Sequence, residues 1–110
     1  MHATRLVYDA MRSIDSATFT GVYQKLGSAL SHATSIVKIV NNSNVLVTVS
    51  TDGINDQDIL PANSFFLYDI TSDSPPETGS VFVENGRQYF VKGSAGVGLV
   101  YLVTQYVTQV

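Results

Sequence analysis

"LVYLVTQYVTQV", residues 99–110, is rich in the β-branched and aromatic residues that favour strands. A period of two makes this strand apolar on both faces, with Leu99, Tyr101, Val103 and Val107 on one and Val100, Leu102, Tyr106 and Val110 on the other. A strand that is apolar on both faces has to be covered on both. We expect the domain's own core on one side, and a second sheet or a neighbouring subunit on the other.

The same alternation recurs from residue 35 onward, and it predicts further strands at 35–40, 45–50 and 64–70. The cluster "NNSN" (41–44) predicts a turn that joins the first two of these strands as an antiparallel hairpin. Asn85-Gly86 predicts another hairpin within 81–92, and Pro75-Pro76 marks an extended loop over 71–80. Short strands at this spacing predict an all-β, single-domain antiparallel β-sandwich or barrel-like fold.

The N-terminal part fits more than one pattern. Residues 4–14 fit a short helix through Leu6, Ala10, Met11 and Ile14, and they also fit a strand. We prefer an extended N-terminal segment, an arm over residues 1–16, followed by the β-sandwich over residues 17–110. The first strand of that sandwich is expected near 17–26.

The glycine-rich segment "GSAGVG" (93–98) raises the question of phosphate binding. A Walker loop ends in Gly-Lys-Ser/Thr and a Rossmann fingerprint opens a helix, but here Lys92 precedes the glycines and a strand follows them. Without a helix N-terminus no dipole is available to hold a phosphate. The segment is therefore predicted to be the tight connection of the last hairpin.

Composition excludes several classes of function. The 110 residues match one domain, and the absence of cysteine excludes thiolate zinc sites, iron–sulfur clusters and disulfides. A net charge of −3 and scattered basic residues argue against a nucleic-acid partner. No apolar run is long enough to cross a membrane and no secretion signal is evident, so a soluble protein made in the cytoplasm is expected.

The low content of charged residues is the most informative feature of the composition. Only 14% of residues are charged, against about 25% in ordinary domains, while 45% are hydrophobic. A small monomer normally keeps itself soluble with surface charge. The composition suits a homo-oligomer or a subunit partly buried in an assembly; a monomer with a neutral polar surface is the alternative.

Few residues suggest catalysis or metal binding. The loop acids Asp52, Asp56 and Asp58 could offer oxygen ligands to Ca²⁺, but their spacing is not that of an EF-hand. Ser31 and His32 are adjacent, so their side chains do not naturally face each other, and no nucleophile elbow is present. "NNS" (41–43) is a glycosylation sequon that we interpret as turn chemistry. We expect no enzyme activity, no metal and no cofactor.

Several short motifs follow one another in a fixed order along the chain. They lie at Leu26-Gly27, Asn41 to Asn44, Ser50 to Gly53, Pro61 to Phe65, Asp69 to Ser72, and Tyr89 to Tyr101. Each motif alone is ordinary turn and strand chemistry, and their order is the specific part. In this order they resemble a family of small virion structural proteins of tailed bacteriophages. The resemblance covers roughly residues 20 to 105, and Phe90, Leu99 and Asn63 depart from the simplest form of its motifs.

The resemblance implies a non-enzymatic protein of the virion, assembled in the host cytoplasm. The function we expect first is a capsid decoration or cement protein that binds the major capsid protein or other virion proteins and stabilises the assembled head. A neck, adaptor or tail ring component at the portal vertex is the alternative within the same class. A carbohydrate-binding β-sandwich is the alternative from a different class.

The candidate interface follows from the two-faced last strand and the N-terminal segment, because apolar residues there lack an evident partner within the domain. The candidate interface residues are Leu6, Val7, Tyr8, Met11, Tyr101, Val103, Tyr106 and Val107.

Overall fold

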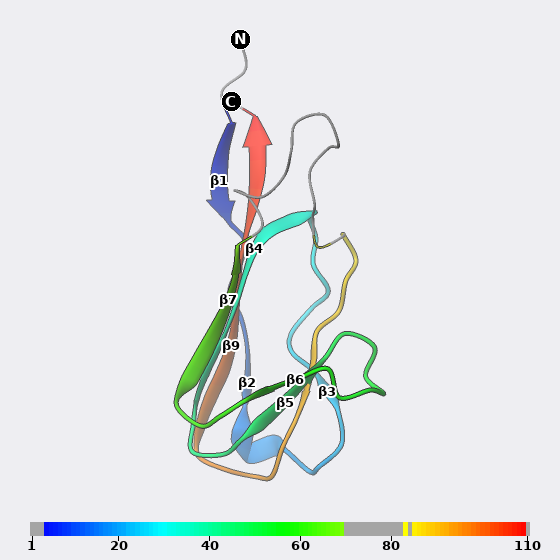
Figure 1. The fold of residues 1–110 in the computed structure, drawn as a ribbon, viewed down its shortest axis with the longest axis vertical. Coiled ribbons are helices and arrows are strands. Elements are labelled where there is room, and N and C mark those ends of the chain that lie inside the picture. Colours follow the sequence, from blue (N-terminus) through cyan, green and yellow to red (C-terminus); the bar gives the residue numbers. More distant parts are fainter. Residues whose placement is uncertain (1–3, 70–82, 84, 110) are drawn as a thin grey trace.

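A computed structural model describes residues 4–69, 83 and 85–109, and it confirms the predicted all-β antiparallel sandwich (Figure 1). One sheet has five strands in the order β1-β9-β4-β7, with β2 also paired to β9, and the other has the order β3-β8-β5-β6. The strands of the first sheet are β1 (Thr4–Tyr8), β2 (Arg12–Asp15), β4 (Thr34–Ser43), β7 (Ser64–Asp69) and β9 (Gly98–Gln109). Those of the second are β3 (Gln24–Lys25), β5 (Val47–Ser50), β6 (Asp58–Leu60) and β8 (Phe90–Lys92).

The strand predicted at 99–110 is β9, the longest strand in the described part of the chain. One edge of β9 pairs with β4 from Gly98 to Tyr106. Its other edge pairs with β2 near its start and with β1 near its end, so β1 and the end of β9 form a two-stranded ribbon at one end of the molecule (Figure 1). Because β9 is long enough to pair with β1, β2 and β4, it is the central strand of the five-stranded sheet.

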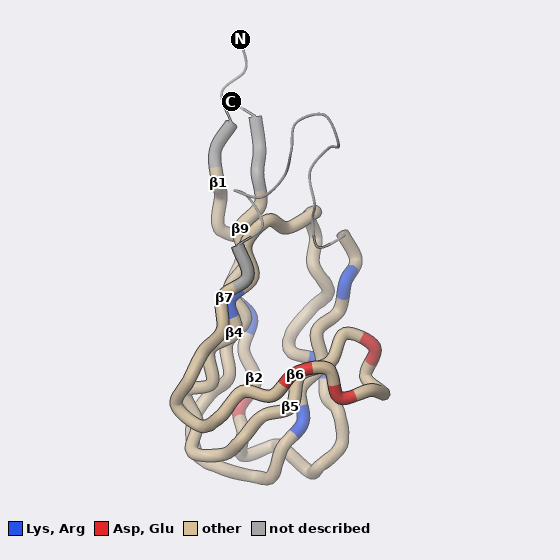
Figure 2. Tube along the Cα trace, viewed as in Figure 1, with Lys and Arg blue, Asp and Glu red and all other residues tan. Residues whose placement is uncertain are grey.

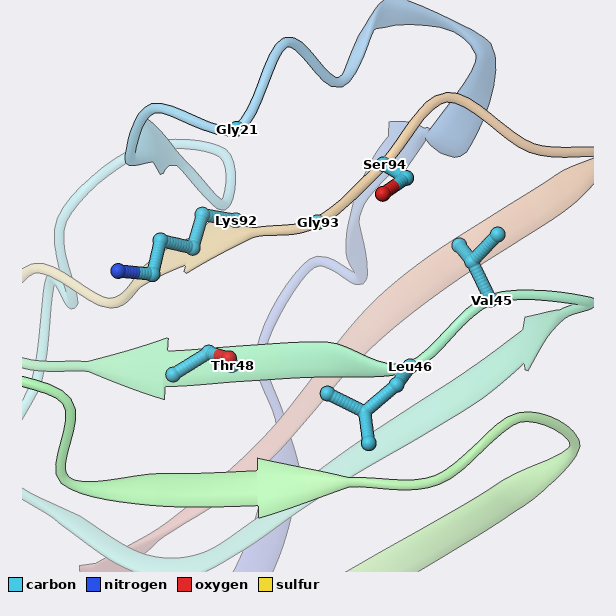
Figure 3. Close-up of a pocket in the computed structure, with 7 residues that line it drawn as sticks. All are labelled: Gly21, Val45, Leu46, Thr48, Lys92, Gly93 and Ser94. Atoms are coloured by element: carbon cyan, nitrogen blue, oxygen red, sulfur yellow. The ribbon is translucent and has the colours of Figure 1, made fainter.

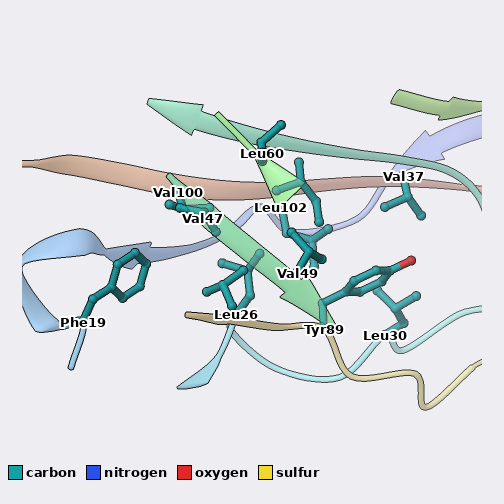
Figure 4. Packing of buried hydrophobic residues seen from close by; sticks show 12 residues of the cluster. Phe19, Leu26, Leu30, Val37, Val47, Val49, Leu60, Tyr89, Val100 and Leu102 are labelled. Atoms are coloured by element: carbon teal, nitrogen blue, oxygen red, sulfur yellow. The ribbon is translucent and has the colours of Figure 1, made fainter. Parts of the chain in front are cut away.

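The hydrophobic core lies between the two sheets (Figure 4). Every second residue of β4 and β9 points inward, and apolar residues of β5, β6 and β8 meet them from the other sheet. Packing alternate residues of two aligned sheets in this way is what closes a β-sandwich. The core residues are Phe19, Leu26, Leu30, Val37, Ile39, Val47, Val49, Leu60, Tyr89, Val91, Val100 and Leu102.

The hairpin predicted across residues 41–44 is wrong. β4 pairs with β7 and β9, whereas β5 pairs with β6 and β8, so the chain crosses from one sheet to the other after Ser43. Stacking these strands across the core buries the inner side of each, which pairing them edge to edge would not do. Asn41 is fully buried at this crossing, and its amide donates to the carbonyl oxygens of Val45, Leu60 and Pro61. The sequon asparagine is therefore a structural residue.

The hairpin predicted across the glycine segment 93–98 is also wrong. β8 belongs to the four-stranded sheet and β9 to the five-stranded one, so the segment is a second crossing between sheets. It runs close to the first crossing: the amide of Val97 donates to Asn44 Oδ1 at 2.9 Å, and that of Asn44 donates to the Val97 carbonyl at 3.1 Å. The glycines allow these two backbones to approach each other.

Of the hairpin predicted at Asn85-Gly86, the structure describes the turn and the strand that follows it. Gly86 has a φ of 91°, as a tight turn requires, and its amide donates to the Leu30 carbonyl at 2.8 Å. Val83 forms an isolated bridge with Thr34, while β8 pairs with β3 and β5. The rest of the expected first strand, and the loop predicted at 71–80, lie outside the described residues.

The N-terminal segment is extended as preferred, and the helical alternative is wrong. β1 and β2 are hydrogen-bonded to β9 of the same chain, so the described part of residues 1–16 is built into the sheet and is no free arm. The strand expected near 17–26 is reduced to β3, because a 3₁₀ turn over Ser16–Thr18 occupies its start. The described residues contain no helix long and apolar enough to cross a membrane.

Thr104 of β9 is fully buried, and its Oγ1 has no hydrogen-bond partner in the described part of the chain. A buried hydroxyl without a partner carries a desolvation cost. Thr104→Val, which keeps the shape and removes the hydroxyl, is expected to raise the free energy of unfolding by about 1 kcal/mol and the Tm by about 4 °C. Thermal unfolding followed by circular dichroism measures this change.

Thr34→Val is the matched control for that substitution. Thr34 is equally buried, but its hydroxyl donates to the His32 carbonyl at 3.0 Å. Removing it is expected to lower the Tm, because a hydrogen bond is lost. A lower Tm in both variants would contradict the assignment of Thr104 as unpaired.

Candidate functional site

The outer face of the five-stranded sheet, which points away from the core, is the candidate functional site. Residues directly opposite each other in antiparallel strands share a face. One row across this face joins Leu67, Lys38 and Val103, and the next joins Phe65, Val40 and Tyr101. Towards the ribbon, Leu6 lies opposite Val107 and Tyr8 opposite Gln105. The face therefore continues without a break from β7 to β1.

Several large apolar side chains on this face are exposed. Tyr8 is 68% exposed, Phe65 63%, Leu67 53% and Leu6 43%. Phe65 and Leu67 lie on β7 and Leu6 and Tyr8 lie on β1, so exposed apolar side chains lie along both edges of the face. Exposed apolar surface gathered on one face of a sheet is a candidate interaction site.

The structure brings together most of the predicted interface residues. Leu6, Tyr8, Tyr101 and Val103 lie on the outer face, with Val107 on it by register. Met11 lies between β1 and β2 and is 61% exposed.

Two predicted interface residues are on the opposite side of the sheet. Val7 lies opposite Tyr106 in the ribbon, on the face that carries the core further along β9. The Tyr106 ring stacks on His32, with centroids 3.8 Å apart. They are therefore not part of the outer face.

Sequence reasoning missed Phe65, Leu67 and Lys38 as members of this face. The alternation in 64–70 separates Phe65 and Leu67 from Phe66, and the structure confirms that separation, because Phe66 packs against the core. The alternation therefore indicated which residues of β7 share a face. It could not indicate that this face is the outer one without the pairing of β7 with β4.

The outer face of the four-stranded sheet has a different character, because it carries paired charges. Lys92 Nζ lies 2.8 Å from Asp56 Oδ1 and 4.7 Å from the centre of the Tyr23 ring. The Tyr23 hydroxyl donates to the same Asp56 oxygen atom at 2.6 Å. Burial and the neighbouring Asp56 raise the pKa of Tyr23 to about 12, and the hydrogen bond from Lys92 lowers the pKa of Asp56. These contacts pair the charges of Lys92 and Asp56 with each other within the chain.

The acidic loop between β5 and β6 lies beside that sheet (Figure 2). Asp52 accepts hydrogen bonds from the amides of Asn55 and Ile54, and these hold the pKa of its carboxyl well below the ordinary value. Asp58 Oδ1 accepts from the amide of Ile59. The carboxylates considered for Ca²⁺ thus stabilise the loop itself, and the described residues hold no cluster of three or more acidic, histidine or cysteine side chains suited to a metal.

A groove of about 400 Å³ lies where the two crossings leave the four-stranded sheet (Figure 3). None of the side chains that line it is aromatic, so it offers no ring on which a sugar could stack. The only charged group in it is Lys92, which is already paired with Asp56. The groove is lined by Gly21, Val45, Leu46, Thr48, Lys92, Gly93 and Ser94.

Comparison with known proteins gives weak likenesses. The sequence matches no family model and no curated protein. Among solved structures, it is similar to the Dit protein of phage SPP1, described as a paradigm of the hub adsorption apparatus in phages that infect Gram-positive bacteria. The TM-score is 0.41 and the identity 11%, over 94% of this chain and 49% of Dit, so the chain spans about half the length of that protein.

A second similar structure is YomS, a protein derived from the SPBc2 prophage. Its TM-score is 0.41 and its identity 11%, over 91% of this chain and 96% of YomS. Both similar proteins come from phages or prophages. Likenesses this weak assign neither a family nor a function to this chain.

Proposed function

We propose that this chain is a non-enzymatic structural protein of a phage virion, a decoration or cement protein that docks on the assembled head. The observation that carries the proposal is the outer face of the five-stranded sheet, where Phe65 and Leu67 of β7 are among the most exposed apolar side chains. The low charge content and the order of the sequence motifs support it.

The size of the outer face fits a docking surface. A standard interface buries about 800 Å² on each partner, of which a little over half is apolar. Phe65 and Leu67 on β7, and Leu6 and Tyr8 on β1, would supply part of that apolar area to a partner that spans the sheet.

Stabilisation of the head would follow from mass action. A protein that binds the assembled shell, and not its separated subunits, shifts the equilibrium towards the shell. The rigid sandwich positions the outer face without any rearrangement of the chain. No catalytic step is needed for this role.

The proposal is tested by introducing negative charges on the outer face of the five-stranded sheet. Phe65→Glu combined with Leu67→Glu is expected to weaken binding to phage particles depleted of this protein by at least about 30-fold, as loss of a central apolar contact does. Co-sedimentation of the purified protein with those particles measures the change. Both side chains are more than half exposed, so the fold should persist.

Ile59→Glu is the matched control, because Ile59 is 59% exposed on β6 of the other sheet. Its binding should equal that of the unchanged protein. If the doubly charged variant bound as well as the control, the outer face would not be the docking surface. Electron microscopy of the reconstituted particles separates the two virion positions: copies spread over the shell support a decoration protein, and a single ring at one vertex supports the neck or tail alternative.

A further inference from the structure

Two dipeptides of this chain can undergo a spontaneous reaction within the backbone. Asn85-Gly86 and Asp52-Gly53 are the only places in the sequence where glycine follows an asparagine or an aspartate. At such a dipeptide the glycine nitrogen can attack the side-chain carbonyl carbon of the preceding residue and close a five-membered succinimide ring, because glycine has no side chain to hinder the approach. The fold places the two dipeptides in different surroundings.

At Asp52-Gly53 both reacting groups are held in place. Asp52 Oδ1 accepts from the amides of Ile54 and Asn55 at 2.8 and 2.9 Å, and from the Ser50 hydroxyl at 2.7 Å. The Gly53 amide donates to the same Ser50 oxygen at 3.0 Å. A carboxyl group that accepts several hydrogen bonds stays ionised. An ionised carboxyl has no hydroxyl group to release, so the ring does not close here.

At Asn85-Gly86 the reacting groups are much less restrained. Asn85 is exposed, and its side-chain amide has no hydrogen-bond partner among the described residues. A Cβ built at Gly86 would meet nothing within 4 Å, so no neighbouring atom crowds the turn there. The Gly86 amide is restrained by its hydrogen bond to the Leu30 carbonyl, at 2.8 Å. A hydrogen bond in an exposed turn opens at a small free-energy cost.

We propose that Asn85 is a site of spontaneous deamidation in the folded protein, and that Asp52 is protected from the corresponding isomerisation. When the hydrogen bond to Leu30 opens, the Gly86 nitrogen loses its proton to water and attacks Asn85 Cγ. The Cγ–Nδ2 bond breaks, and the side-chain nitrogen takes a proton from water and leaves as ammonia. Water then adds to one of the two ring carbonyls, which leaves aspartate or isoaspartate at this position.

The reaction changes the turn in two ways. Either product places a new carboxylate in the polar groove of about 560 Å³ that Asn85 and Arg87 line. The isoaspartate product also lengthens the backbone by one methylene group. Leu30, a core residue, is bound to this turn by two hydrogen bonds, from the Gly86 amide to its carbonyl and from its own amide to the Arg87 carbonyl at 2.9 Å. The isoaspartate product is therefore expected to unfold at a lower temperature.

Asp52→Asn provides the matched comparison, because it places the same Asn-Gly dipeptide in both turns and keeps the Oδ1 acceptor. The folded variant is incubated in mildly alkaline buffer, and peptide mapping by mass spectrometry follows aspartate and isoaspartate formation at positions 52 and 85. We expect Asn85 to react at least about 10-fold faster than position 52, because an exposed turn opens more readily than a loop held by several hydrogen bonds. In urea, where both turns are unfolded, the two rates should become similar.

The unchanged protein tests the proposal without a substitution at position 52. In the folded state Asn85 should deamidate while Asp52 forms no isoaspartate, and Asn85→Gln, whose longer side chain disfavours the five-membered ring, should stay unmodified. Equal rates at positions 52 and 85 of folded Asp52→Asn would show that the fold does not select the site. An Asn85 that reacts in urea and stays intact in the folded protein would show that the hydrogen bond to Leu30 keeps the turn closed. Either of these two results would overturn the proposal.

Discussion

Replacing Arg12 by methionine is expected to lower the free energy of unfolding by about 3–5 kcal/mol, because several partly buried acceptors lose their donor together. Arg12 is 8% exposed. Its Nε donates to the Ser28 carbonyl at 2.8 Å, and its Nη2 donates to the Ala29 carbonyl at 3.1 Å. Its Nη1 donates to the Ala10 carbonyl, and Asp9 lies 3.4 Å from Nη2. The side chain thus fastens β2 to the segment that follows β3.

The aliphatic part of the Arg12 side chain is packed as closely as its guanidinium group. A Cβ built at Gly27, whose φ is +70°, would lie 2.5 Å from Arg12 Cβ, so the stem packs directly on the glycine. Arg12→Lys keeps the charge and most of the stem but cannot reproduce the fork of donors. It is therefore expected to lose part of the stability, between the unchanged protein and Arg12→Met.

Urea unfolding measures both Arg12 variants, with the exposed Lys25→Met as the control for loss of a positive charge. The control should stay within about 0.5 kcal/mol of the unchanged protein. Equal stability of Arg12→Met and the control would mean that water replaces the guanidinium without cost, and that the network does not hold β2 in place.

The location of the strands could be predicted from the sequence, because alternation with a period of two is a local signal. The strand expected at 99–110 is β9, and the one expected at 64–70 is β7. Alternation also separates the two faces of each strand: Val100 and Leu102 are buried, and Leu99 and Tyr101 on the other face are not. It does not say which strand lies beside which.

The pairing of the strands could not be predicted, because the same turn residues are found in hairpins and in connections between sheets. Asn, Ser and Gly suit a hairpin within one sheet and also a crossing between two sheets. The clusters at 41–44 and 93–98 are both crossings, and the contacts that reveal this join residues far apart in sequence, such as Asn44 and Val97. The role of Arg12 could not be predicted for the same reason, since two of its acceptors, the carbonyls of Ser28 and Ala29, are 16 and 17 residues away.

The candidate site could be predicted in part. An apolar second face on β9 indicated that something must cover it, and Tyr101 and Val103 are indeed on the outer face. Two of the four exposed large apolar side chains on that face come from β7, which pairs only with β4 in the described part of the chain. Phe65 and Leu67 could be assigned to the face only after the register of β7 on β4 was known.

Gly98→Ala is expected to lower the free energy of unfolding by at least about 4 kcal/mol, since it combines backbone strain with a clash that has no easy relief. Gly98 has a φ of +115°, which side chains rarely adopt. A Cβ there would lie 2.1 Å from the Asn42 carbonyl oxygen and 2.8 Å from Ser43 Cα. Both are backbone atoms of β4, paired to β9 at this point, so they cannot move without opening the sheet.

Gly21→Ala separates the cost of backbone strain from the cost of the steric clash. Gly21 also has a positive φ, +84°, but a Cβ there meets nothing within 4 Å. It should therefore show only the backbone cost, about 1–2 kcal/mol. Urea unfolding of both variants gives the difference directly. A Gly98→Ala variant that lost no more stability than Gly21→Ala would show that β4 can give way at Asn42. The close approach of β4 and β9 would then not be what requires glycine at the start of β9.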